Sequence, residues 1–172
     1  MPIDDVPERT RHRLSMAVYA TTEFEYSFTV CARHQGSPFA DKRLADEVVR
    51  SLLWTRDHYR WLLFCYCLMP DHLHFVCRLT ERDAKMLNAG ARGTVAEGVL
   101  DHLGRFKSFT TNVSWKLGFR GKLWQKSSYD RVFDLLRPFE ETVLYTLGNP
   151  VRKGLVADWQ EWPYSRIVDP WW

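Results

Sequence analysis

The sequence predicts an α+β fold, in which one antiparallel sheet packs against two crossover helices and a further helix follows near the C-terminus. Two observations support this prediction. An apolar run from Trp61 to Met69 stops at Pro70-Asp71, and a second apolar run follows at once, which is typical of a β-hairpin. Segments with helical spacing separate this hairpin from strand-like segments on either side. With 172 residues, the chain is long enough for one domain with a sizeable core.

The elements before the hairpin are a strand and a helix. Residues Tyr26 to Cys31 alternate and are rich in β-forming residues, which predicts a strand. From Asp41 to about Tyr59 the spacing is helical, with apolar residues at positions 44, 45, 48, 49, 52 and 53. Asp41 is a candidate N-cap for this helix.

The hairpin covers residues 61–79. A two-residue turn at Pro70-Asp71 would place Cys67 opposite His74 and Met69 opposite His72. His72 and His74 would then share one face of the strand, because side chains two residues apart point the same way.

The second half of the chain predicts a loop, a long helix and a fourth strand. The loop covers residues 81–93, and the helix runs from Thr94 to Leu117. Thr94-x-x-Glu97 resembles a capping box. The expected apolar stripe consists of Val95, Val99, Leu103, Phe106 and Val113. Leu123-Trp124 and residues 129–133 suggest the fourth strand.

A last helix opens at Pro138, carries Tyr145 and ends near Gly148-Asn149-Pro150, because the residue before proline disfavours helical angles. The order of elements is therefore βαββαβ with an extra C-terminal helix that carries the tyrosine, which is the ferredoxin-like arrangement. We expect residues 1–172 to form a single domain, with a lead-in over 1–20 and a tail over 157–172.

Composition limits the classes of protein. No apolar run is long enough to cross a bilayer, and the acidic start Met1-Pro2-Ile3-Asp4-Asp5 lacks the pattern of a signal peptide. We therefore expect a cytoplasmic protein that does not associate with membranes. The four cysteines are expected to be buried thiols rather than disulfides.

The charge is unevenly distributed. From Arg105 to Lys153 there are ten Lys or Arg against four acidic residues, although the whole chain carries only +3. This basic half also contains Trp115, Phe119, Trp124 and Tyr129, so it fits a polyanion with stacking bases as well as an ordinary solvated surface.

The candidate chemical groups are two histidines, a tyrosine and an asparagine. His72-x-His74 on a strand could offer two nitrogens to a divalent cation, or could be two polar residues at the start of a strand. Tyr145 and Asn149 are separated by one helical turn and could supply a nucleophile and an oxygen ligand for Mg²⁺ or Mn²⁺. Alternatively, Tyr145 is a core aromatic residue and Asn149 a helix cap.

Three motifs together carry a family resemblance. They are Met69-Pro70-Asp71-His72-Leu73-His74, then Leu123-Trp124-Gln125 before Tyr129-Asp130, then Tyr145-x-x-x-Asn149-Pro150-Val151-x-x-Gly154-Leu155-Val156. The set resembles the single-tyrosine HUH transposases of small insertion sequences. With the tail Trp162-Pro163-Tyr164-Ser165, it is most similar to the REP-associated tyrosine transposases, over residues 20–166.

This resemblance implies that His72 and His74 hold Mg²⁺ or Mn²⁺, with Asn149 as a further ligand, and that Tyr145 is the nucleophile. It also implies cleavage and joining of single-stranded DNA near hairpins through a 5′-phosphotyrosine, by a monomer or a homodimer. The candidate DNA contacts in the basic half are Arg105, Lys107, Lys122, Trp124, Arg131, Arg152 and Lys153.

Two other interpretations remain open. The chain could be a domesticated hairpin-binding protein that keeps the fold without transposing DNA. It could also hold a structural zinc ion, because Cys65-x-Cys67 precedes His72-x-His74 in one hairpin, although the expected register leaves Cys65 a full step away beside Val76.

Overall fold

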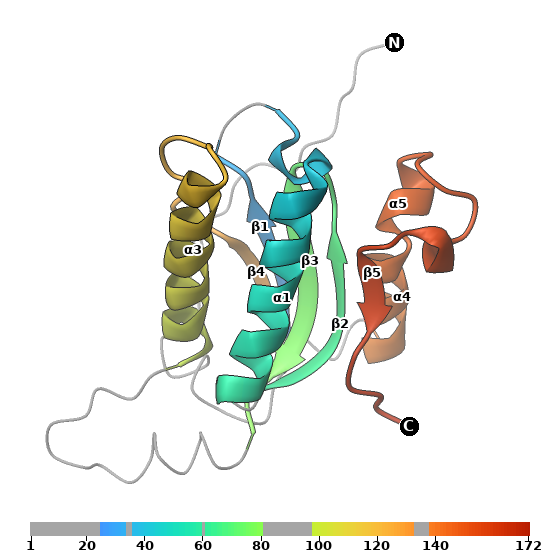
Figure 1. The fold of residues 1–172 in the computed structure, drawn as a ribbon. Coiled ribbons are helices and arrows are strands. Elements are labelled where there is room, and N and C mark those ends of the chain that lie inside the picture. Colours follow the sequence, from blue (N-terminus) through green and yellow to red (C-terminus); the bar gives the residue numbers. More distant parts are fainter. Residues whose placement is uncertain (1–24, 34–35, 60, 81–97, 133–137) are drawn as a thin grey trace, which may run out of the picture.

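The computed structural model describes residues 25–33, 36–59, 61–80, 98–132 and 138–172 (Figure 1). Its centre is a five-stranded sheet in the order β4-β1-β3-β2-β5, and every neighbouring pair is antiparallel. The first four strands in the chain have the predicted βαββαβ order, so the α+β, ferredoxin-like prediction is confirmed. The strands are β1 (Tyr26–Cys31), β2 (Leu62–Leu68), β3 (His72–Arg78), β4 (Tyr129–Val132) and β5 (Ser165–Ile167).

The β2–β3 hairpin has the register expected from a two-residue turn. Cys67 lies opposite His74, and the amide of Met69 donates to the carbonyl of His72 at 2.8 Å. The pairing shifts between Leu63 and Cys65, where β2 contains an irregularity. The two histidines are therefore on the strand and on one face, as the sequence predicted.

Two helices cover one face of the sheet: α1 (Lys42–Tyr59) and α3 (Val99–Lys116), side by side in front of the strands in Figure 1. Alternate strand residues such as Phe28, Leu73 and Phe75 are buried beneath them. Asp41 caps α1, since its carboxylate accepts from the Arg43 amide at 2.9 Å. A short 3-10 turn, η2 (Pro38–Ala40), precedes this cap.

The start of α3 differs from the prediction. Gly98 precedes the first helical residue, and its amide donates to the Asp101 carboxylate at 3.0 Å. The helix therefore begins at Val99, and the predicted capping box at Thr94 and Glu97 lies outside the described residues. The buried stripe ends on Thr110 and Ser114, whereas Val113 is only partly buried.

The lead-in over residues 1–20, the loop over 81–93, Val95 and Phe133 also lie outside the described residues.

The opposite face of the sheet is covered by α4 (Phe139–Leu147). Val143 and Leu147 are completely buried and form a small core with Phe64, Cys65 and Val76. Because Val76 alternates with Phe75, this second core lies on the face of β3 that also carries His72 and His74. A separate turn of helix, α5 (Asn149–Arg152), follows at once.

The predicted tail forms structure that the sequence did not indicate. After the 3-10 turn η3 (Trp159–Glu161), strand β5 pairs with β2. The Asp169 carboxylate accepts from the Arg56 guanidinium and from the Leu63 amide, the latter at 2.8 Å. These contacts hold the last residues against the sheet, so the tail is part of the same folded unit. No helix in the described part of the chain is long and apolar enough to span a bilayer.

Candidate active site

The two histidines of β3 form a close pair at the start of the strand. Their ring centroids are 4.5 Å apart and their planes are nearly perpendicular, at 89°. Both residues are partly buried, and the side chain of His72 is 18% exposed. The pair is therefore close enough for both rings to contact one ligand.

Each imidazole is held through its Nδ1 atom. Nδ1 of His72 lies 2.6 Å from a carboxylate oxygen of Asp71, and Nδ1 of His74 lies 2.8 Å from the hydroxyl oxygen of Thr29 on the neighbouring strand. An ionised carboxylate can only accept, so His72 carries a proton on Nδ1 and donates it to Asp71. This arrangement leaves the Nε2 atoms for a cation, in the manner of metal sites whose second ring nitrogen is hydrogen-bonded.

Burial keeps His74 neutral. Desolvation lowers the pKa of His74 from 6.5 to about 3, and the neighbouring His72 and the positive charge of Arg152 add to the effect, while Asp71 opposes it. A neutral imidazole keeps the lone pair that a cation requires. His74 therefore fits a metal ligand better than a proton carrier near neutral pH.

We expect the shifted pKa of His74 to make folding of the metal-free protein sensitive to acid. Between pH 6.5 and about 3 the unfolded histidine binds a proton that the folded one does not, so stability falls as the pH is lowered. Above pH 6.5 the stability no longer depends on the protonation of His74. Between pH 6.5 and about 3, the free energy of unfolding changes by at most about 1.4 kcal/mol per pH unit. Chemical denaturation of the wild type and of His74→Gln at several pH values measures the part of this pH dependence that is due to His74.

The difference between these two proteins isolates His74 from the carboxylates that also titrate in acid. A difference in unfolding free energy that stays constant from pH 7 to pH 4 would contradict the expected shift.

Tyr145 lies on the helix that covers the histidine face. It is 55% exposed, while Val143 and Leu147 on the same helix are buried against the sheet. The alternative of a core aromatic residue is therefore wrong, and the phenol can be reached from solvent.

Arg152, the last residue of α5, contacts the tyrosine. Its guanidinium carbon lies 3.8 Å from the centroid of the Tyr145 ring, and its Nη2 donates to the Tyr145 carbonyl at 2.6 Å. Burial is the main cause of the lowered pKa of His74 and of the raised pKa of Cys67. The positive charge of Arg152 adds to the first shift and opposes the second. The sequence proposed Arg152 as a DNA contact but did not indicate its contact with the tyrosine.

Asn149 acts as a helix cap in the structure. Its Nδ2 donates to the carbonyls of Thr146, at 2.9 Å, and Tyr145, at 3.4 Å. The sequence predicted that Tyr145 and Asn149 share one helix. In the structure they do not, because α4 ends at Leu147 and α5 begins at Asn149. The cap occupies the amide nitrogen of Asn149, so its role as a ligand would depend on the side-chain oxygen.

The candidate DNA contacts do not gather in one place. Trp124 is only 3% exposed, and its indole donates to the Thr110 hydroxyl at 2.7 Å. The sequence-based assignment of Trp124 to DNA is corrected here, because neither face of a buried ring can stack on a base. Lys107 is half-buried and donates to the Lys126 carbonyl at 3.3 Å, and burial lowers its pKa.

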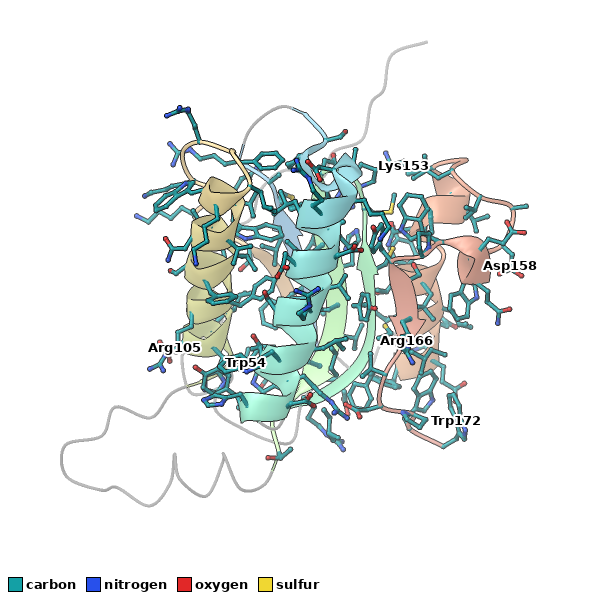
Figure 2. All side chains as sticks on the ribbon, in the orientation of Figure 1. Trp54, Arg105, Lys153, Asp158, Arg166 and Trp172 are labelled. Atoms are coloured by element: carbon teal, nitrogen blue, oxygen red, sulfur yellow. The ribbon has the colours of Figure 1, made fainter. Side chains whose placement is uncertain are left out.

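The other basic candidates are divided between two regions. Figure 2 shows Arg105 beside Trp54 at one end of the helical layer, far from Lys153. Arg105 there contacts Tyr59, with Nη1 3.3 Å from the phenol oxygen. Lys122 and Lys153 are exposed. Arg131 is on β4 opposite Ser27, so its backbone is in the sheet.

The cysteines do not complete a zinc site. Cys65 packs with Val143 and Leu147 rather than beside the histidines, and burial raises the pKa of Cys67 to about 11. Within the ranges that the structure describes, no three His, Cys, Asp or Glu residues are grouped to hold a metal. Of these four residue types, the described part of the site thus provides two imidazoles as possible metal ligands.

Comparison with known proteins supports the fold. No protein-family model matches the sequence, and no curated protein matches it. Among solved structures, a REP-associated tyrosine transposase bound to a REP hairpin matches with a TM-score of 0.64 and 17% identity, covering 84% of this chain and 77% of that one. The resemblance found in the sequence is therefore confirmed at the level of the fold.

A second match is a Deinococcus radiodurans R1 chain provisionally named a transposase, with a TM-score of 0.46 and 16% identity. It covers 73% of this chain and 88% of that one. At this TM-score it adds nothing to the assignment.

Sequence reasoning missed two residues of the site, Thr29 and Asp71. Asp71 directly precedes His72, so its position beside the histidine could have been noticed in the sequence. Thr29 could not, because its contact depends on which strand pairs with β3. That pairing joins residues 45 positions apart.

Proposed function

We propose that the protein is a transposase of the single-tyrosine HUH type, which cleaves and rejoins single-stranded DNA. One observation carries the proposal: an exposed tyrosine lies on the helix that covers the face of the sheet where two paired histidines are held by their Nδ1 atoms. The fold shared with a REP-associated tyrosine transposase supports it.

The proposed reaction is an attack by Tyr145 on a DNA phosphodiester. A bond forms between the phenol oxygen and phosphorus, and the bond from phosphorus to the 3′ oxygen breaks. The phenol loses its proton and the departing 3′ oxygen gains one, which leaves a 5′-phosphotyrosine and a free 3′-hydroxyl. Because the phosphotyrosine is itself a phosphodiester, a 3′-hydroxyl can reverse the step and rejoin DNA.

The histidines and Asn149 are proposed to hold the cation. Nε2 of His72 and of His74, with the side-chain oxygen of Asn149, would bind Mg²⁺ or Mn²⁺, which polarises a phosphate oxygen and favours charge building up on it. Asp71 and Thr29 keep the two rings oriented through Nδ1. Burial lowers the pKa of His74 and so keeps its imidazole neutral.

The proposed substrate is single-stranded DNA beside an imperfect hairpin. The solved relative was bound to a REP hairpin, and the net positive charge of residues 105–153 suits a phosphate backbone. We propose that residues 1–172 work as one domain, since the tail pairs with β2 and contacts α1.

Binding of a hairpin with a single-stranded flank should weaken steeply as salt increases, because each phosphate contact releases counterions. Fluorescence anisotropy between about 50 and 200 mM salt should show an affinity loss on the order of 100-fold if about four phosphates are contacted. A fully paired duplex of the same length is the control. Tighter binding to the duplex, or affinity that does not depend on salt, would contradict the proposed substrate.

The same preparations test the activity. With Mg²⁺ or Mn²⁺, the wild type should cut the single-stranded flank. Tight hairpin binding without cleavage would instead support a domesticated DNA-binding protein.

A further inference from the structure

Arg152 has an unusual environment for an exposed arginine. Its guanidinium lies over the Tyr145 ring, with the central carbon 3.8 Å from the ring centroid. A cation over an aromatic face is attracted by the negative charge of the π-system. The Nη2 bond to the Tyr145 carbonyl fixes the same guanidinium from a second direction. Two independent contacts therefore place this charge beside the proposed nucleophile.

The position of the guanidinium also relates it to the histidine pair. The helix α4 that carries Tyr145 packs, through Val143 and Leu147, on the face of the sheet that carries the histidines. The guanidinium, which belongs to α5, thus lies against the tyrosine of the helix that covers the histidine face. A phosphate reached by the phenol and by a cation on the imidazoles would lie within this region.

The Arg152 guanidinium has further N–H donors with which it could bind such a phosphate. A guanidinium has five N–H donors arranged in a planar fork. Within the described part of the chain, the bond from Nη2 to Tyr145 is the one hydrogen bond found for Arg152. The fork geometry matches two non-bridging phosphate oxygens, and a charge-assisted pair of this kind is among the strongest hydrogen bonds in proteins.

Gly148 makes the approach possible. Its backbone angles, φ −73° and ψ 2°, are accessible to any residue, so conformational freedom does not explain a glycine here. A Cβ at this position would lie 3.0 Å from Nη1 of Arg152 and 3.2 Å from the Leu144 carbonyl oxygen. A side chain would therefore press on the guanidinium, which would have to move by a few tenths of an ångström.

We propose that Arg152 binds the phosphate attacked by Tyr145 and keeps hold of it in the phosphotyrosine, and that Gly148 provides the space for this. The inference rests on the proposed function for the identity of the phosphate, and it assigns Arg152 to the reacting group rather than to the DNA backbone in general. Arg50, an exposed arginine on α1 that pairs with Glu47 and lies outside the basic half, serves as the matched control.

The first test compares cleavage and binding in three variants. Arg152→Gln should lower the rate of cleavage of a hairpin-flanked single strand by on the order of 100-fold, as for loss of a transition-state donor, while hairpin affinity falls only a few-fold. Arg152→Lys should recover part of the rate, because it restores charge without the planar fork. Arg50→Gln should cleave at close to the wild-type rate.

Gly148→Ala tests the geometry while keeping the charge of Arg152. Gly148→Ala should bind the hairpin as the wild type does but cleave it at least tenfold more slowly, because the added methyl group shifts the guanidinium away from the position that fits the phosphate. Wild-type cleavage rates in both Gly148→Ala and Arg152→Gln would overturn the inference and leave the proposed function standing.

A second measurement does not depend on cleavage. Inorganic phosphate is titrated into ¹⁵N-labelled wild-type protein, and the arginine Nε–H signal that is missing from Arg152→Gln is followed by NMR. A saturable shift of this signal, retained in Arg50→Gln, is expected. If the wild type never cuts DNA, the proposed function fails, and this titration alone decides for or against a phosphate site at Arg152. An unchanged signal overturns the inference.

Discussion

Replacing Tyr145 by phenylalanine should abolish DNA cleavage and leave folding and hairpin binding intact. The substitution removes one oxygen from a residue that is 55% exposed, so little packing is lost. The ring that faces the Arg152 guanidinium is retained. Without the phenol oxygen no bond to phosphorus can form, and we expect cleavage to fall below detection. Denaturing gels with labelled single strands measure both cleavage and the covalent adduct.

Tyr164→Phe is the matched control for this variant. The Tyr164 hydroxyl donates to the Asp46 carboxylate at 3.2 Å, away from α4 and the histidine pair. We expect Tyr164→Phe to cleave like the wild type. An adduct that persists in Tyr145→Phe would show that another residue is the nucleophile.

Alanine at either histidine should remove metal-dependent cleavage almost completely. Among the described residues no third His, Cys, Asp or Glu side chain joins the two imidazoles as a metal-holding group, so loss of either histidine leaves the cation with one imidazole. EDTA should have the same effect on the wild type, and Mg²⁺ or Mn²⁺ should reverse it. His74→Ala should also cost on the order of 1 kcal/mol of stability, because its hydrogen bond to Thr29 is lost.

His58→Ala is the control for these variants. His58 is exposed on α1, where it stacks on Trp54 at 4.4 Å. The His58→Ala variant should cleave DNA at the wild-type rate. Stoichiometric zinc in the purified protein that disappears in Cys67→Ala would instead support a structural zinc site and contradict the assigned role of the histidines.

The parts of the fold that the sequence predicted are those determined by local patterns. The turn pair Pro70-Asp71 between two apolar runs gave both the hairpin and its register, because a short turn leaves one way to pair the strands. Helical spacing located α1 to within one residue. The common face of His72 and His74 follows from the strand alone.

Other features depend on contacts between distant segments. Strand β5 has three residues and pairs with an edge that the sequence could not identify. Trp124 appeared to be a surface aromatic in a basic segment, yet it fills the core between Phe39 and Phe106. The break after Leu147 turns Asn149 into a cap, and the stacking of Arg152 on Tyr145 needs both that break and the space at Gly148.

The most direct test of the account is to find where DNA becomes attached to the protein. Wild-type protein is incubated with Mg²⁺ and a hairpin with a labelled single-stranded flank, then denatured, digested and analysed by mass spectrometry. We predict one adduct, in which the 5′-phosphate of the cleaved strand is bonded to Tyr145. Cleavage without an adduct, or an adduct on a different residue, would contradict the proposed mechanism.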